Sequence, residues 1–223
     1  MRSILRPTLA IACLALASYS SQADMASIAA PGSRPTYKAE ASSHAVPDNP
    51  MERAVEWAIQ IAENPIHGYS QGAENATPSC PYTGSREGPD YDCSSLVYHA
   101  LDHAGFDIIA AWRKNPACWS RYNGTQETGD ADTIWPDLQA IGGFAKYRWL
   151  DVKDDLRRGD ILCDPEHHVA FYIGNGKTVE ARGVNNPRGG DWRTGDQGGE
   201  IDFYSPYGRG WTEVYRYVGA VGK

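Results

Sequence analysis

Apolar residues recur at the helical spacing of three and four in two stretches of the first half of the chain. The first stretch covers residues 51–62, and Asn49 and Pro50 before it suit the N-cap and the first helical position. The second covers residues 96–104 and is followed by Gly105, a residue type that commonly terminates helices. We therefore predict two helices, each with one apolar face.

The second helix is predicted to begin at a cysteine. Asp92 can accept hydrogen bonds from the free N–H groups of the first turn, which makes it the N-cap and Cys93 the first helical residue. The helix dipole at that position favours a thiolate, and a thiolate is the nucleophile of cysteine hydrolases. This stretch alone supports a catalytic cysteine and a structural or disulfide-bonded cysteine about equally.

The second half of the chain contains short apolar strands, and Arg148-Trp149-Leu150 is expected to begin the sheet. A hairpin is predicted over residues 168–181 with its turn at residues 174–176. A three-residue loop places Glu180 on the face of His168, whereas a two-residue loop turns Glu180 to the other face. An imidazole can take the proton of a thiol, and a third polar group commonly orients that imidazole. His167 is predicted to point to the opposite face and is the weaker candidate for the base.

Three motifs together resemble the NlpC/P60 cysteine peptidases, in particular the branch found in phage lysins. The motifs are Tyr91-Asp92-Cys93-Ser94-Ser95-Leu96-Val97, Gly159-Asp160-Ile161 and His168-Val169-Ala170-Phe171-Tyr172-Ile173-Gly174. The lysin branch is further matched by His67-Gly68-Tyr69-Ser70-Gln71-Gly72, residues 86–92 and Gly195-Asp196-Gln197. The resemblance implies a papain-like α+β fold, in which the nucleophile helix packs on an antiparallel sheet.

The same resemblance implies roles for individual residues. Cys93 is the expected nucleophile, His168 the base and Glu180 the residue that orients the base. Glu180 departs from the family, where His, Asn or Gln is commoner, although a carboxylate also accepts from an imidazole N–H. A tyrosine before the nucleophile lines the site in the family; Tyr69 is the expected match, and Tyr82 is its competitor. The residues on either side of the nucleophile, Asp92 and Ser94, are also expected to bind substrate.

The implied substrate is the peptide stem of bacterial peptidoglycan, and no cofactor is expected. We expect a cysteine endopeptidase that cleaves the bond between D-glutamate and the diamino acid. The alternatives are an N-acetylmuramoyl-L-alanine amidase of lysin type and an inactive secreted module that binds the cell wall. The intact Cys93, His168 and Glu180 favour an enzyme over the binding module.

The N-terminal sequence is typical of a secretion signal. Arg2 and Arg6 precede a short apolar run over residues 9–17, and Ser21-Gln22-Ala23 offers a cleavage site between small residues. We predict a signal peptide over residues 1–23, a flexible spacer over 24–48 and one catalytic domain over 49–223. The mature protein is expected outside the cell or at the wall, without a membrane anchor and as a monomer.

Composition limits the partners and the chemistry further. A formal net charge of -7 argues against binding to nucleic acid. If Cys93 is free, Cys80 and Cys118 are the expected disulfide pair and Cys163 a buried thiol, while a bridged Cys93 is the rival. His99 and His103 have a spacing that can bind zinc, although a solvated helix face is favoured and no metal site is expected.

Two further groups of residues have open roles. Aromatic residues of the stretch 106–147, among them Trp135 and Tyr147, are expected either to line a substrate groove or to cover the edge of the core. Arg182, Arg188 and Arg193 follow Glu180 and either bind carboxylates of the stem peptide or are solvated loop charges, which is the favoured alternative.

Overall fold

The structure, a computed structural model, describes residues 49–71, 86–109, 128–183 and 194–219, which belong to one unit of the chain. The predicted signal peptide and spacer lie outside the described residues. In chain order the elements are α1 Pro50–Glu63, α2 Cys93–His103, α5 Ile134–Ile141, β1 Phe144–Arg148, α6 Trp149–Val152, β2 Ile161–Asp164, β3 His168–Gly174, β4 Lys177–Ala181, β5 Ile201–Tyr204 and β6 Glu213–Tyr217. Among the described helices, none has the length and apolar character needed to cross a membrane.

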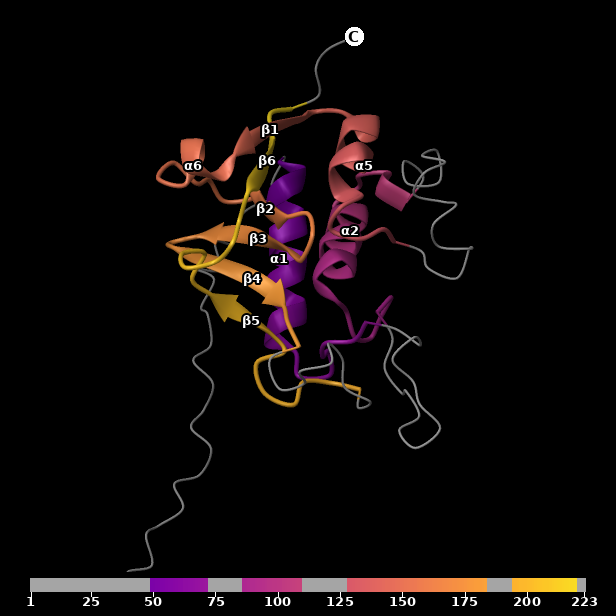
Figure 1. Cartoon of the computed structure of the whole chain (residues 1–223). Helices are drawn as coiled ribbons and strands as arrows, with labels where there is room; N and C mark the ends of the chain where they lie inside the picture. The colour runs from indigo at the N-terminus through magenta and orange to yellow at the C-terminus, as the bar shows by residue number, and fades with distance from the viewer. Residues whose placement is uncertain (1–48, 72–85, 110–127, 184–193, 220–223) are drawn as a thin grey trace, which may run out of the picture. The chain divides into compact units, whose positions relative to one another are not determined.

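The six described strands form one antiparallel sheet with the order β1-β6-β2-β3-β4-β5. Helices α1 and α2 lie side by side on one face of this sheet, and α2 also packs against β3 (Figure 1). The predicted α+β fold with the nucleophile helix on an antiparallel sheet is therefore confirmed.

Local sequence signals set the bounds of α1. The side chain of Asn49 accepts a hydrogen bond from the Met51 N–H at 3.0 Å, and Pro50 takes the first helical position, as predicted. The helix ends at Glu63, two residues before Pro65. Its apolar face is buried against α2 and the sheet, through Met51, Ala54, Val55, Ala58, Ile59, Ile61 and Ala62.

The strands separate two apolar clusters. Along β3, Val169, Phe171 and Ile173 belong to the core shared with α1 and α2. Ala170 and Tyr172 point to the other face and belong to a smaller cluster, which also contains Trp149, Leu162, Trp211 and Val214. Because side chains alternate along a strand, His168 shares the face of Ala170 and Tyr172.

The turn between β3 and β4 differs from the predicted three-residue loop. Gly174 pairs directly with Lys177, so the loop contains only Asn175 and Gly176, whose φ angles of 52° and 65° fit a type I′ turn. A register shift between Tyr172 and Gly174 marks a bulge, which adds one residue to β3. The bulge restores the expected register, and Glu180 lies on the face of His168 after all.

The edges of the sheet correct one further expectation and decide between the two roles left open for Trp135. The sheet begins at Phe144 in β1, and of the stretch Arg148-Trp149-Leu150, which was expected to begin it, only Arg148 lies in the strand, whereas Trp149 and Leu150 belong to the short helix α6. Trp135 stacks on Tyr215 with ring centroids 5.2 Å apart, so it covers the core edge.

Candidate active site

Cys93 occupies the first position of α2, as the sequence predicted. Asp92 is the N-cap, and its Oδ1 accepts a hydrogen bond from the Ser95 N–H at 2.7 Å. The Ser95 hydroxyl accepts in return from the Asp92 N–H at 2.9 Å, which completes a capping box. Two reciprocal bonds thus fix the backbone on both sides of the cysteine.

Arg86 holds the N-cap residue Asp92 in place through hydrogen bonds to both of its carboxylate oxygens. Its Nε donates to Asp92 Oδ2 at 2.5 Å and its Nη2 to Asp92 Oδ1 at 3.1 Å, and Nη2 also donates to the Ser94 hydroxyl at 2.9 Å. Further bonds tie the guanidinium to the backbone oxygens of Thr128 and Gly129. A buried arginine with this many acceptors fixes the start of α2 to the segment after residue 127.

Asp92 and Ser94 were predicted to bind substrate. Both are buried, and their polar atoms already bind Arg86 and Ser95. The structure therefore shows them holding the turn on either side of Cys93, and their contact with substrate stays a prediction.

The sulfur of Cys93 lies against the first residues of β3. The backbone N–H of Val169, the residue after His168, faces the sulfur and favours its charged form. Burial, and to a lesser extent the Asp92 carboxylate, raise the pKa of the Cys93 thiol to about 12, although the Val169 N–H, Arg86 and the Ser94 N–H oppose the shift. The thiol is therefore neutral at pH 7, contrary to the thiolate expected from the helix dipole alone.

His168 and Glu180 meet across the hairpin, as predicted. His168 Nε2 and Glu180 Oε2 are 2.9 Å apart. With Nε2 bound to the carboxylate, Nδ1 is the nitrogen left to exchange a proton with the thiol. The ring stacks on Trp211 with centroids 5.5 Å apart and an interplanar angle of 21°, and Trp211 is anchored by a bond from its Nε1 to the Pro206 oxygen. The stacking on Trp211 and the hydrogen bond to Glu180 together define the plane of the His168 imidazole.

The Glu180 carboxylate is fully buried and surrounded by donors. The Thr178 hydroxyl donates to its Oε1 at 2.5 Å, and Arg209 Nη2 lies 3.3 Å from its Oε2. Burial alone raises the pKa of Glu180, but the hydrogen bond and charge of His168, the Thr178 hydroxyl and Arg209 outweigh it and hold the pKa below its usual value. Glu180 is thus a carboxylate whose charge faces the imidazole.

Tyr69 reaches the site on a segment tied to the loop before Cys93. Tyr91 donates its N–H to the Gly68 oxygen at 2.9 Å, and the Asp90 carboxylate accepts from the Gly68 and Gly195 N–H groups at 2.8 and 2.9 Å. Burial raises the pKa of Tyr69, and the proximity of Cys93 and Asp92 raises it further. The Tyr69 hydroxyl is therefore neutral and close to Cys93; its competitor Tyr82 lies outside the described residues.

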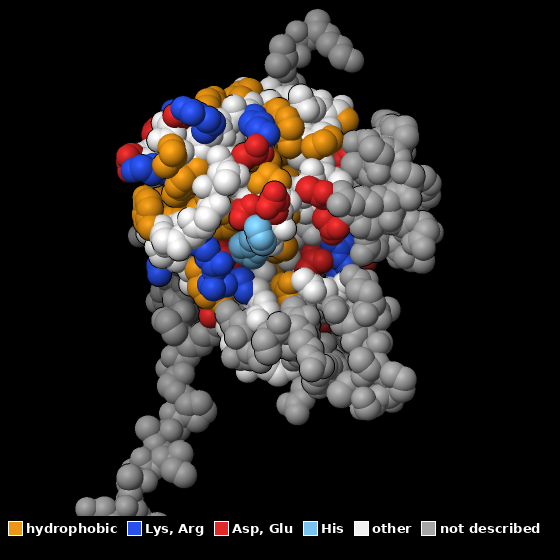
Figure 2. Space-filling view, viewed as in Figure 1, with side chains coloured by type: hydrophobic (Ala, Val, Ile, Leu, Met, Phe, Trp, Pro, Cys, Tyr) orange, Lys and Arg blue, Asp and Glu red, His pale blue; other side chains and the backbone are white. Residues whose placement is uncertain are grey.

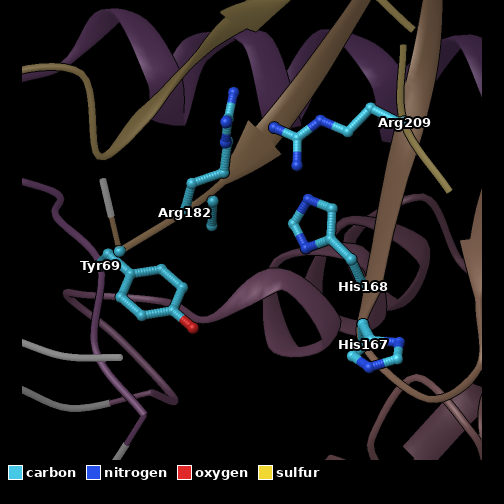
Figure 3. Close-up of a pocket in the computed structure, with 7 residues that line it drawn as sticks. Tyr69, His167, His168, Arg182 and Arg209 are labelled. Carbon is cyan, nitrogen blue, oxygen red and sulfur yellow. The ribbon is translucent and has the colours of Figure 1, made fainter. Parts of the chain in front are cut away.

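A cavity of about 300 Å³ opens beside these residues (Figure 3). Its described lining is Tyr69, His167, His168, Ala181, Arg182, Gly183 and Arg209. In Figure 3 the guanidinium groups of Arg182 and Arg209 lie next to each other on the side of the His168 ring. His168 and Tyr69, predicted from separate motifs, are thus brought to one cavity.

Other candidate residues have structural roles or lie elsewhere. His99 is not solvated as expected, because its Nε2 lies 2.8 Å from Glu87 Oε2, while His103 is exposed. Cys93 and Cys163 are free thiols, and Cys163 is buried as predicted. The expected pair Cys80 and Cys118 lies outside the described residues, as do Arg188 and Arg193. The described residues contain no cluster of metal-binding side chains.

A family model described as endolysin-like domain matches residues 44–179, more than half of the chain. The chain belongs to the endolysin-like domain family. This match confirms the resemblance to phage lysins and includes Tyr69, Cys93 and His168, whereas Glu180 is the first residue beyond it. A comparison with curated proteins finds no match.

Several solved structures are similar to this endolysin-like protein. The hypothetical invasion protein Rv1477 of Mycobacterium tuberculosis has 21% identity and a TM-score of 0.42. The match covers 78% of this chain and 66% of the Rv1477 chain, so this chain spans just under two thirds of the length of Rv1477. The P60 domain of antigen MAP1204 from M. avium subspecies paratuberculosis has 17% identity, coverages of 76% and 98%, and a TM-score of 0.41. The peptidoglycan hydrolase RipB from Mycobacterium tuberculosis has 20% identity, coverages of 78% and 69%, and a TM-score of 0.40.

Sequence reasoning missed three residues of the endolysin-like site. Thr178 lies two positions before Glu180 on the same face of β4, so strand alternation could have identified it. Arg209 and Trp211 come from the segment between β5 and β6 and reach Glu180 and His168 only through the fold. No local pattern in the sequence pairs them with the hairpin.

Proposed function

We propose that this endolysin-like protein is a cysteine peptidase that hydrolyses an amide bond in the peptide stem of peptidoglycan. Cys93 is the nucleophile, His168 the base and Glu180 the residue that orients the base. The contact of His168 Nε2 with Glu180 Oε2 at 2.9 Å supports this assignment most strongly, together with the free Cys93 at the start of α2, whose sulfur faces the N–H of Val169. Membership of the endolysin-like family supports the cell wall as the source of the substrate.

The raised pKa of the thiol decides how the reaction begins. Because Cys93 is neutral at pH 7, His168 Nδ1 takes the S–H proton as the sulfur attacks the carbonyl carbon of the substrate. The imidazolium that forms faces the buried Glu180 carboxylate, which stabilises its positive charge. The oxygen of the tetrahedral intermediate is held by N–H groups at the start of α2, where the helix dipole is positive.

The second half of the reaction returns the proton. His168 protonates the leaving amine, the C–N bond breaks, and a thioester remains on Cys93. Water then attacks the thioester while His168 takes one of its protons. The carboxylic acid product leaves, and the proton returns from His168 to the sulfur. The reaction needs no cofactor, since each proton is carried by the thiol, the imidazole or water.

The bond between D-glutamate and the diamino acid is our first choice for the cleavage site, and the bond between muramic acid and L-alanine is the alternative. We also propose that the protein is secreted, on the sequence of residues 1–23. Secretion brings a wall hydrolase to its substrate.

The decisive experiment incubates purified peptidoglycan with the protein and with its Cys93→Ala variant. New amino groups are quantified and the fragments are identified by mass. Release by the unmodified protein alone supports the cysteine peptidase, and the fragment masses identify the bond. Equal release by both proteins excludes Cys93 as the nucleophile. If neither protein releases amines while both sediment with the wall, a wall-binding module replaces the proposed enzyme.

A further inference from the structure

Two arginines form one wall of the cavity beside His168. Arg182 follows β4, and Arg209 lies between β5 and β6, so two distant segments supply the pair. Their guanidinium nitrogens Arg182 Nε and Arg209 Nη2 lie 3.9 and 3.3 Å from Glu180 Oε2. We refer to Arg182 and Arg209 as the arginine pair.

The charge of the arginine pair exceeds that of its internal partner. The pair carries two positive charges, and Glu180 supplies one negative charge that is already hydrogen-bonded to His168 and Thr178. The described lining of the cavity contains no carboxylate. The described lining therefore presents positive and no negative side-chain charge to the cavity, in a chain whose formal net charge is -7.

The two guanidinium groups have different surroundings: Arg182 stacks on an aromatic ring, and Arg209 lies against Glu180. The Arg182 guanidinium lies over the ring of Tyr204 at 3.8 Å from its centroid, an arrangement that fixes its plane. Arg209 Nη2 is buried and has no hydrogen-bond partner among the described residues, although it lies near Glu180. Figure 2 shows a cluster of Lys and Arg side chains beside the histidines on this face.

Paired guanidinium groups recognise planar anions, and carboxylates above all. A cavity of about 300 Å³ accommodates part of a peptide rather than a whole glycan strand. Because His168 lines the same cavity, an anion bound there lies within one or two residues of the amide that reacts.

We infer that the arginine pair binds a free carboxylate of the substrate peptide, next to the scissile amide. The inference rests on the proposed function for the identity of the peptide, and it defines the specificity of the site. An endolysin-like hydrolase with this pair prefers stem peptides in which that carboxylate is free over those in which it is amidated.

The test measures binding separately from cleavage. The Cys93→Ala variant is titrated with two synthetic stem peptides, which differ only in a free or an amidated carboxylate beside the scissile bond. We expect the free acid to bind about 10- to 100-fold more tightly, the range of charge-assisted hydrogen bonds in a partly desolvated site. Arg182→Met and Arg209→Met in this background should each remove most of the preference and leave the amidated peptide nearly unchanged. Arg157→Met, at an arginine with a 63% exposed side chain, is the matched control.

Equal binding of the two peptides to Cys93→Ala overturns the inference, and this comparison needs no arginine variant to fold. A loss of affinity for both peptides alike in a folded arginine variant also overturns it, since the arginine then acts only through Glu180. Cleavage of the peptides by the unmodified protein is followed in parallel. Preferential binding without any cleavage would leave the arginine pair in place and reject the proposed peptidase.

Discussion

Replacement of Glu180 by Gln tests whether the carboxylate acts through its charge. The amide has nearly the same shape, and its oxygen can still accept from His168 Nε2 while its nitrogen faces Thr178. Arg209, at 3.3 Å from Oε2, favours this orientation because it repels an NH₂ group at that position. The variant therefore keeps the hydrogen bond to the imidazole and loses the negative charge.

The size of the effect follows from the geometry. Glu180 Oε2 lies 2.9 Å from His168 Nε2, so the charges of carboxylate and imidazolium are about 4 Å apart, where they attract by roughly 4 kcal/mol at an effective dielectric constant of 20. The hydrogen bond retained by Gln recovers part of this energy. A remaining loss of about 2–4 kcal/mol in the transition state lowers kcat/KM by roughly 30- to 1000-fold.

In Glu180→Gln the positive charge of Arg209 loses its nearby carboxylate, and this allows a second test. In Glu180→Gln, its guanidinium repels the imidazolium that forms during the reaction, so Arg209→Met added to this variant should restore activity by about tenfold. The assay uses the amidated peptide, since its cleavage does not depend on a substrate carboxylate at the arginine pair. Glu166→Gln is the matched control, because Glu166 is exposed and precedes His168 by two residues.

Two outcomes of these measurements would contradict the electrostatic argument for Glu180. If Glu180→Gln stays within about threefold of the unmodified protein in kcat/KM, the charge of Glu180 plays no part in catalysis and the electrostatic argument is wrong. A loss of activity that Arg209→Met deepens would contradict the predicted repulsion. Circular dichroism of each variant separates these outcomes from unfolding.

Three further predictions concern Arg86, Cys93 and Glu180. Arg86→Met leaves the buried Asp92 carboxylate without its bidentate partner and should lower the free energy of unfolding by about 3–5 kcal/mol, measured with urea. Because the pKa of Cys93 is raised to about 12, the rate of its alkylation by iodoacetamide should rise about tenfold per pH unit between pH 8 and 11, followed by mass spectrometry. Folding lowers the pKa of Glu180, so the ionised carboxylate stabilises the protein at pH values above the ordinary carboxyl pKa, and this stabilisation is lost as the pH falls through the pKa of the folded state. The difference in the free energy of unfolding between the unmodified protein and Glu180→Gln should therefore shrink in acid.

Each of these predictions has a result that contradicts it. A urea midpoint unchanged in Arg86→Met would mean that solvent reaches Asp92 and that the cap does not need the arginine. An alkylation rate that is constant between pH 6 and 9 would show a thiolate paired with imidazolium in the resting protein. A stability difference that is constant from pH 7 to pH 3 would mean that the pKa of Glu180 is the same in the folded and unfolded chains.

The elements that sequence reasoning predicted well depend on local signals. Asn49 and Asp92 are caps that act within one turn of their own helix, and the structure uses both as predicted. The apolar face of α1 likewise follows from the spacing of its own residues. Trp149 was misplaced in the sheet because an aromatic residue suits a strand and a core helix equally, and only contacts with Trp211 and Leu162 decide between them.

The surroundings of Cys93 and His168, the proposed catalytic pair, were less predictable than the two residues themselves. Cys93 and His168 are marked by motifs, but the pKa of the thiol depends on burial and on Asp92, and these outweigh the helix dipole. Arg209 lies against Glu180, from which nearly thirty positions of the sequence separate it, and Trp211 stacks on His168 from more than forty positions away. Such contacts arise from sheet order, which a single sequence does not specify.

The hairpin shows why a prediction with the wrong turn still placed Glu180 correctly. Sheet faces alternate with a period of two, so the face of Glu180 depends on whether the number of unpaired residues between the strands is odd or even. A three-residue loop has three such residues; the structure has a two-residue turn at Asn175 and Gly176 and one bulged residue in β3. Both arrangements give an odd number, and both bring Glu180 to His168. The Asn-Gly turn favours tight pairing of the strands, and the bulge that corrects its register is therefore what places the carboxylate in the active site.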